Sequence, residues 1–136
     1  MKQGSQDSKK YSHENKKRNP IVRIIYSFKY STQGIKYIYK NEASVWLHFL
    51  LIVASTALGI FYQITLVEWA IIIFAVASIL ACELLNTGIE AAVDLVTLEK
   101  RELARIAKDC GSAASAVFSV ACIIAEALIF IPYIIK

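Results

Sequence analysis

Three long segments of this chain are almost free of charged side chains, and they constrain its fold more than any other feature. Ala43–Val67 and Trp69–Cys82 contain no Asp, Glu, Lys or Arg, and Cys110–Ile135 contains only Glu126. A helix of about 20 apolar residues spans the hydrocarbon core of a bilayer, because each residue adds about 1.5 Å. The sequence therefore predicts an all-α membrane protein with three transmembrane helices. These helices should cover about residues 44–62, 67–95 and 110–135.

The composition agrees with this class of protein. Of the 136 residues, 57% are hydrophobic, which is too apolar for a soluble domain of this size. Composition alone leaves a soluble all-helical core open, so the lengths of the apolar segments decide. The cysteines Cys82, Cys110 and Cys122 show no metal or redox spacing and are interpreted as small apolar residues of helices. His13 and His48 have no partner at metal-ligand spacing, so no zinc site is expected.

The segment before the spans divides into a polar tail and an expected surface helix. Residues 1–19 are rich in Lys, Ser, Gln and Asn and carry no signal-peptide pattern, which predicts a disordered tail. Residues 20–136 should form one membrane domain that begins with a helix at about residues 20–40. The apolar face of that helix holds Ile21, Ile24, Ile25 and Phe28. The basic residues of this helix can bind lipid phosphates, which favours an amphipathic helix on the membrane surface. A soluble helix that packs on a partner is the alternative.

Basic residues indicate the orientation of the chain in the membrane. They are dense before the first span and again between the second and third spans, at Lys100, Arg101, Arg105 and Lys108. The link between the first two spans has none, and only Lys136 follows the third span. Lys and Arg concentrate on the cytoplasmic side of membrane proteins. We therefore expect a multi-pass protein of the cytoplasmic (inner) cell membrane with a cytoplasmic N-terminus.

Four polar residues lie in the second half of the second span. Glu83, Asn86, Glu90 and Asp94 are spaced by 3, 7 and 11 residues from the first, so they share one stripe of a helix. A charge inside a bilayer costs ~2.5–3.5 kcal/mol, and such residues tend to be functional. Two other interpretations remain open. Glu90 and Asp94 could lie on a solvated face outside the membrane, and Glu83 and Asn86 could hold helices together.

The depth of these acids places them near the cytoplasmic surface. If Trp69 lies at the outer interface, Glu83 is ~21 Å deeper and Glu90 ~31 Å deeper. Glu83 then lies just inside the bilayer, and Glu90 lies at its surface together with Glu42. Other charged residues should gather at the same level: Lys100, Arg101, Arg105, Lys108 and Asp109. An ordinary charged rim at the membrane interface would look similar.

Such a cluster has the groups that phosphoryl transfer to a membrane alcohol needs. Two carboxylates can hold Mg²⁺ when substrate phosphates supply further oxygens, and Lys and Arg stabilise the charge of a transferring phosphoryl group. A carboxylate slightly inside the bilayer can accept the proton of a lipid hydroxyl. The sequence contains neither a Walker loop nor a kinase-type glycine loop, so the residues alone do not predict ATP binding.

Two sequence blocks carry a resemblance to a known family. ELLNTGIEAAVDL at Glu83–Leu95 and ARIAKDCGSAA at Ala104–Ala114 resemble the signature blocks of the small prokaryotic integral-membrane diacylglycerol kinase family, which includes undecaprenol kinases. The similarity extends back through Arg23–Ala43. The resemblance implies an ATP-dependent, Mg²⁺-dependent lipid kinase. It also implies a homotrimer of three-span subunits with active sites shared between subunits at the cytoplasmic interface.

The resemblance also implies roles for individual residues. Glu83 matches the proposed general base, and Glu42 and Glu90 match acids that bind Mg²⁺ with ATP. The positions implied for the nucleotide and its phosphates are Arg23, Tyr30, Asn86, Lys108 and Asp109, with Glu99, Lys100 and Arg101 at the edge of the nucleotide. The positions implied for the lipid substrate are Arg23, Ser31, Glu83 and Ser112.

The sequence indicates the reaction more clearly than it indicates the lipid substrate. Asn41–Ala43 and Gly111–Ala114 resemble the diacylglycerol branch, whereas Val67–Trp69, His48 and Leu128–Pro132 resemble the undecaprenol branch. We expect diacylglycerol, converted to phosphatidic acid, with undecaprenol, converted to undecaprenyl phosphate, as the alternative. Glu126 fits neither branch. A non-enzymatic membrane assembly or proton-relay protein is the alternative of another class, and no nucleic-acid partner is expected.

Overall fold

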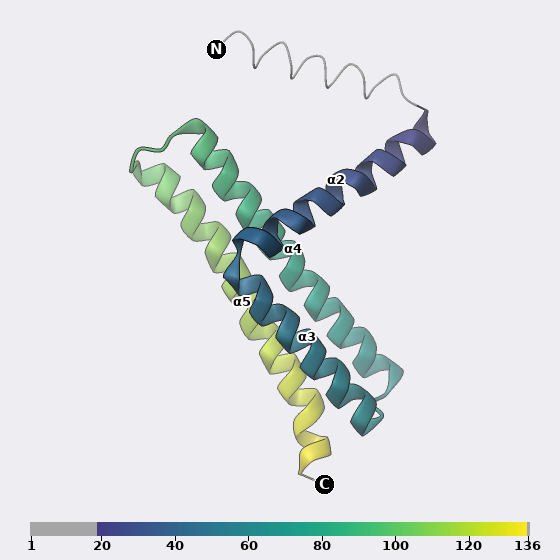
Figure 1. Ribbon diagram of the computed structural model, residues 1–136. Coiled ribbons are helices and arrows are strands. Elements are labelled where there is room, and N and C mark those ends of the chain that lie inside the picture. The colour runs from purple at the N-terminus through teal and green to yellow at the C-terminus, as the bar shows by residue number, and fades with distance from the viewer. Residues whose placement is uncertain (1–18, 136) are drawn as a thin grey trace. The chain divides into compact units, whose positions relative to one another are not determined.

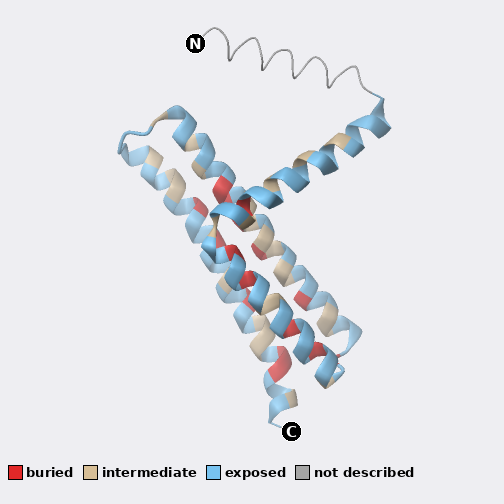
Figure 2. Cartoon of the chain, viewed as in Figure 1, coloured by how far each residue is buried: buried red, intermediate tan, exposed pale blue. Residues whose placement is uncertain are grey.

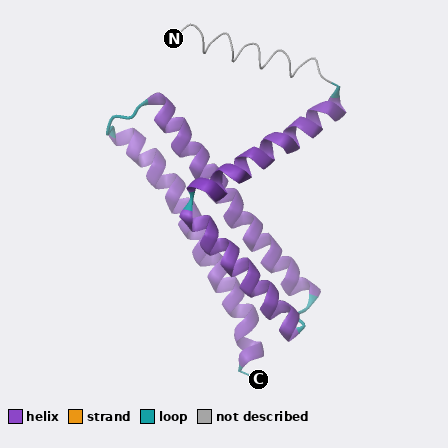
Figure 3. Ribbon diagram, in the orientation of Figure 1, coloured by secondary structure: helices purple, strands orange, loops and turns teal. Residues whose placement is uncertain are grey.

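The computed structural model describes residues 19–135, and this part of the chain consists of helices and short connections. The helices are α2 (Pro20–Asn41), α3 (Ala43–Tyr62), α4 (Leu66–Val96) and α5 (Glu102–Ile134) (Figure 1). Residues 19–135 contain no strand (Figure 3). The all-α prediction is therefore confirmed. The predicted tail lies outside the described residues, except for Asn19.

The chain divides into two compact units, residues Met1–Tyr37 and residues Ile38–Lys136. Most of α2 belongs to the first unit. The predicted apolar face of α2 is exposed along Ile21, Ile24, Ile25 and Phe28, as a helix at a lipid surface requires. Its location at the membrane surface stays a prediction.

The second unit contains the three long apolar helices. Each of α3, α4 and α5 is long and apolar enough to cross a membrane, which confirms the predicted number of candidate spans. Helices α4 and α5 pack against each other, and α3 packs against both (Figure 1). Most of their large apolar side chains are exposed, as expected where lipid rather than protein surrounds a helix.

The turn between α3 and α4 is fixed by local chemistry. Gln63 ends α3 in the left-handed conformation, with φ 51° and ψ 48°. Thr65 then caps α4: the backbone N–H of Glu68 donates to Thr65 Oγ1, and the backbone N–H of Thr65 donates to the carboxylate of Glu68. Trp69 packs here against Gly59, where an added Cβ would lie 2.7 Å from the indole ring.

A compact apolar cluster closes this end of the bundle. Its buried members are Ile64, Ile72, Ile129 and Phe130. Tyr133 packs on the cluster and donates its hydroxyl to Glu68 Oε2 at 2.9 Å, so α5 is tied to the first turn of α4.

The link between α4 and α5 is shorter than the charge pattern suggests. Helix α5 begins at Glu102, eight residues before the predicted start of the third span near Cys110. Lys108 and Asp109 therefore lie on a helix and not in a loop. The physical reason is that apolar composition marks only the part inside the membrane. The segment Glu102–Lys108 consists of Glu, Leu, Ala, Arg and Lys with one Ile, and these residue types continue a helix well beyond that part.

The interior of the bundle is unusually polar. The buried polar side chains of the described residues are His48, Ser55, Glu83, Asn86, Thr87 and Ser115, and they lie among the buried positions along α3, α4 and α5 (Figure 2). Buried polar groups are costly unless they are bonded to one another. The positions of these side chains therefore indicate where a functional site lies in the bundle.

Candidate active site

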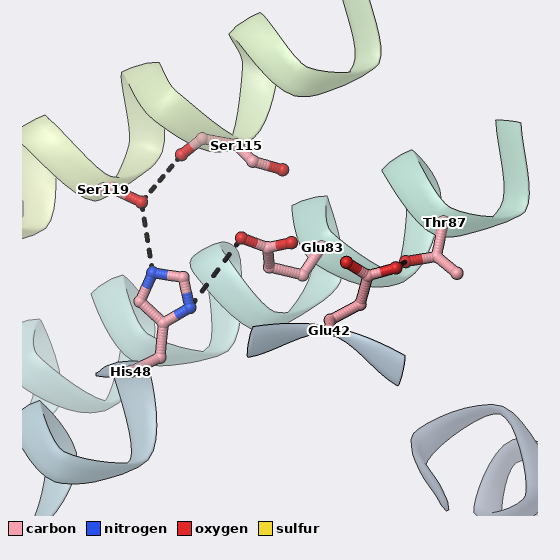
Figure 4. Close-up of polar contacts among 6 residues, drawn as sticks. All are labelled: Glu42, His48, Glu83, Thr87, Ser115 and Ser119. Carbon is pink, nitrogen blue, oxygen red and sulfur yellow. Dashed lines mark hydrogen bonds and ion pairs between the residues drawn. The ribbon is translucent and has the colours of Figure 1, made fainter. Parts of the chain in front are cut away.

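Glu83 is the buried acid at the centre of this polar interior. Its side chain is only 7% exposed, on the face of α4 that meets the other two helices. The nearest cationic or potentially cationic group is His48 of α3, whose Nδ1 lies 3.8 Å from Glu83 Oε1 (Figure 4). The structure thus places Glu83 between helices.

Asn86 and Glu90 continue the stripe along α4. The side-chain amide of Asn86 donates to Glu90 Oε1 at 3.2 Å. Asn86 also fits closely against α5, because residue 111 is a glycine: a Cβ on Gly111 would lie 2.5 Å from Asn86 Oδ1. Among the described residues, that oxygen is buried and has no hydrogen-bond partner. The oxygen therefore lies in the α4–α5 contact, where its acceptor capacity is unused.

This close approach gives a prediction about Gly111. In Gly111→Ala the new methyl group overlaps Asn86 Oδ1, so the α4–α5 contact has to open, at a cost of about 1–3 kcal/mol. Thermal unfolding in detergent should show the loss. Gly88→Ala is the matched control, since nothing lies within 4 Å of its added Cβ and alanine is the better helix former. Equal stability of the two variants would contradict the packing described here.

Glu42 reaches the same part of α4 from another direction. It lies at the junction of α2 and α3 in an extended conformation, with φ −107° and ψ 116°. The hydroxyl of Thr87 donates to Glu42 Oε1 at 3.3 Å (Figure 4). Glu42 and Glu90 are therefore each bonded to a residue of α4, and their shared role stays a prediction. Among residues 19–135, no group of three or more His, Cys, Asp or Glu side chains is placed to hold a metal ion.

The charged residues between α4 and α5 surround a cavity of about 590 Å³. Glu99, Lys100, Arg101, Lys108 and Asp109 all line it, so the structure brings this predicted set together. Three cations of the cavity are paired with acids of the same subunit. Lys108 Nζ donates to Asp94 Oδ1 at 2.6 Å, Arg101 to Glu99 at 2.8 Å and Arg105 to Asp109 at 2.7 Å.

The remaining predicted site residues lie elsewhere. Ser112 is exposed on α5, directly after Gly111. Arg23, Tyr30 and Ser31 lie on α2 in the first unit, where the Ser31 hydroxyl donates to the carbonyl of Ser27 at 2.9 Å. Their predicted contacts with nucleotide and lipid stay predictions.

Sequence reasoning missed polar contacts of the predicted site residues. His48 faces Glu83, Thr87 bonds to Glu42, and Asp94, a member of the predicted stripe, bonds to Lys108. Neither the search for metal ligands nor the resemblance to the undecaprenol branch relates His48 to Glu83. The available signal was its position in a span that has no charged residue, where a polar side chain needs a partner.

Comparison with known proteins identifies the family. Residues 29–130 match the sequence profile described as prokaryotic diacylglycerol kinase. The undecaprenol kinase of Bacillus subtilis is 35% identical over 115 residues, which are 85% of this chain and 94% of that protein. The diacylglycerol kinase of Haemophilus influenzae is 37% identical over 108 residues, 79% of this chain and 90% of that protein. The diacylglycerol kinase of Escherichia coli K12 is 31% identical over 94 residues, 69% of this chain and 77% of that protein.

These matches confirm the predicted lipid kinase and set aside the non-enzymatic alternative. They cover α4 and most of α5, which carry the buried acid and the charged cavity. The chain belongs to the prokaryotic diacylglycerol kinase family.

Proposed function

We propose that this protein transfers the γ-phosphate of ATP to the hydroxyl group of diacylglycerol, giving phosphatidic acid, with Mg²⁺ as the metal and Glu83 as the general base. The observation that carries the proposal is the position of Glu83, a carboxyl group with 7% side-chain exposure in an apolar span. Further along α4 the same stripe continues to Glu90 and to the cavity at Asp94. A lipid hydroxyl inside the bilayer and a phosphate outside it would meet between these groups.

Glu83 suits proton acceptance from a lipid alcohol. The interior around it excludes water, so its carboxylate is not held by solvent and its interactions are strong. When the lipid oxygen attacks phosphorus, Glu83 takes the hydroxyl proton, which typically contributes ~10²–10⁴-fold to the rate.

Glu42 and Glu90 suit Mg²⁺ with a nucleotide. Mg²⁺ prefers oxygen ligands and is commonly held by one or two carboxylates plus substrate phosphates. Glu90 and Glu42, which bond to Asn86 and Thr87 of α4, are the two carboxylates that we assign to the metal, so a larger protein cage is unnecessary. When bound, the metal supplies charge neutralisation at the phosphates. The ammonium group of Lys108, which pairs with Asp94, supplies a further polar contact.

The charged cavity suits the phosphates and edge of the nucleotide. We assign Glu99, Lys100, Arg101, Lys108 and Asp109 to the nucleotide, together with Arg23 and Tyr30 of α2. Arg23, Ser31 and Ser112 are assigned to the lipid head group. Lys and Arg donors act on transferring phosphoryl groups without covalent chemistry, which agrees with a kinase that has no glycine-rich phosphate loop.

The assembly is proposed to be a homotrimer with a cytoplasmic N-terminus. The small residues Gly111, Ser115 and Ser119 form a row that permits close helix packing, but Gly111 and Ser115 are buried inside the subunit itself and offer no surface to a neighbour. The trimer is therefore proposed from the resemblance to the diacylglycerol kinase family, which implies a site shared between subunits. Crosslinking in mild detergent should give trimers under active conditions, and monomers alone would contradict the assembly.

Undecaprenol is the second candidate substrate. The undecaprenol kinase of Bacillus subtilis covers a larger share of both chains than the diacylglycerol kinases named above. The test supplies each lipid with γ-labelled ATP and Mg²⁺ and separates the products by thin-layer chromatography. We expect labelled phosphatidic acid from diacylglycerol. If only undecaprenol gives a labelled product, undecaprenol replaces diacylglycerol as the proposed substrate. If neither lipid gives a labelled product, the proposed function is wrong.

A further inference from the structure

His48 is the least expected member of the buried cluster. Its side chain is 8% exposed and lies between Glu83 of α4 and Ser119 of α5 (Figure 4). The cavity beside it measures about 10 Å³ and is lined mainly by apolar residues, so it offers little room for a water molecule. The hydrogen bonds of this ring therefore have to come from Ser119 and Glu83.

Ser119 determines which ring nitrogen carries the proton. The single hydroxyl proton of Ser119 is donated to the carbonyl oxygen of Ser115, 2.9 Å away. The Ser119 oxygen lies 3.3 Å from His48 Nε2, and it has only lone pairs left to offer. Nε2 must therefore carry a hydrogen and donate it to Ser119. In a neutral imidazole, Nδ1 is then an acceptor.

This acceptor faces Glu83 without a hydrogen bond. Nδ1 is buried and has no partner among the described residues, and Glu83 Oε1 lies 3.8 Å away. With Glu83 ionised and the ring neutral, no proton lies between Nδ1 and the carboxylate, and no hydrogen bond forms between them. When Glu83 is protonated, a hydrogen bond becomes possible, because its carboxyl O–H donates to Nδ1 at about 2.7 Å.

We propose that His48 is a positioning residue for Glu83, arranged so that its Nδ1 lone pair accepts a hydrogen bond from Glu83 only after Glu83 has taken the proton of the substrate hydroxyl. The inference rests on the proposed function, since it gives Glu83 its role as base. It adds a group, His48, that stabilises protonated Glu83 more than it stabilises the resting carboxylate. Such a difference lowers the barrier even though His48 does not touch the reacting atoms.

The step balances without another reactant. The lipid O–H bond breaks, and its proton forms a new O–H bond on Glu83. The lipid oxygen uses the freed electron pair to bond to the γ-phosphorus, while the bond from that phosphorus to the ADP oxygen breaks and ADP keeps the pair. The new Glu83 O–H donates to His48 Nδ1, and the ring keeps its Nε2–H bond to Ser119 throughout.

Two further titratable groups lie near His48. Cys122 and Glu126 of α5 line the small cavity beside the ring, and Cys122 Sγ lies 3.8 Å from Glu126 Oε1. The carboxylate that contacts the ring of His48 is that of Glu83, from α4. Glu126→Gln is therefore the control that separates the two acids.

Two substitutions of His48 separate the proposed role from simple packing. Asparagine places an amide oxygen where Nδ1 is, whereas glutamine places its amide where Nε2 is. His48→Asn should keep an acceptor for Glu83 and retain most of kcat. His48→Gln should keep the Ser119 contact but lower kcat roughly 2- to 10-fold, the size of one hydrogen bond between neutral groups. The KM for ATP should stay unchanged in both.

The experiment measures lipid phosphorylation for His48→Asn, His48→Gln and Glu126→Gln, on preparations of equal oligomer size. A packing role predicts the opposite order, with glutamine, the closer match in volume, the better substitute, and that order would overturn the inference. If kcat falls as far in Glu126→Gln as in His48→Gln, the assignment of His48 to Glu83 is wrong.

A measurement without substrate keeps the inference distinct from the proposed function. In ¹⁵N-histidine-labelled protein at neutral pH, the resting ring should carry its proton on Nε2 and none on Nδ1. Ser119→Ala should remove this preference. A proton on Nδ1 in the resting protein overturns the inference whether or not a lipid product is found.

Discussion

Turnover should collapse in Glu83→Gln, while nucleotide binding and assembly survive. An amide keeps the shape of the carboxylate but cannot accept a proton at neutral pH, so we expect a loss of ~10²–10⁴-fold in lipid phosphorylation. ATP binding should persist, because its assigned contacts come from Glu42, Glu90 and Lys108. Stability should hold or rise, since an amide is cheaper to bury than a carboxylate and its N–H can donate to His48 Nδ1.

The alternative that Glu83 only holds helices together predicts the reverse pattern. Turnover would then change little and the assembly would weaken. Lipid phosphorylation, nucleotide binding and oligomer size should be measured on one preparation, so that a folding defect is not mistaken for a chemical one. Near-normal turnover in a well-assembled Glu83→Gln protein would exclude Glu83 as the base.

Glu90→Gln should change the response to metal. The substitution removes a negatively charged oxygen while leaving an acceptor for Asn86, so the local hydrogen bond at 3.2 Å can remain. We expect the apparent Mg²⁺ affinity to fall by ~10–100-fold or more, because even indirect contacts to a metal ligand are worth that much. Titration of lipid phosphorylation with Mg²⁺ measures the shift, and excess Mg²⁺ should restore part of the activity.

Glu83→Gln is the matched comparison for that experiment. It should lose turnover at every Mg²⁺ concentration without a shift of the midpoint. If Glu90→Gln leaves both the rate and the midpoint unchanged, the metal assignment is wrong.

The three-helix architecture was predictable because it depends on the lengths of the uncharged segments. Long uncharged segments leave a chain few options in a bilayer, and α3, α4 and α5 follow them. The end of an apolar segment, however, does not end a helix. This is why α5 begins at Glu102 and carries Lys108, which had been expected in a loop.

The stripe of acids on α4 was also predictable, since helical spacing alone relates Glu83 to Glu90. Contacts between helices were not, because they depend on which faces meet. No pattern in the sequence relates Thr87 to Glu42, or His48 to Glu83 and Ser119. The small residues of α5 likewise predict close helix packing, but they do not indicate whether the neighbouring helix belongs to the same subunit or to another one.

The buried polar cluster has a consequence for how the subunit acquires its alignment. Apolar helices in lipid gain little from one arrangement over another, because lipid tails are as apolar as leucine. His48, Glu83 and Ser119 come from three different helices and meet at one level. Sliding one helix by a single residue would rotate its polar group by about 100° toward lipid, where a charge costs ~2.5–3.5 kcal/mol. The residues proposed for chemistry would thus also set the register of α3, α4 and α5, so that correct folding and a correctly aligned site are selected together.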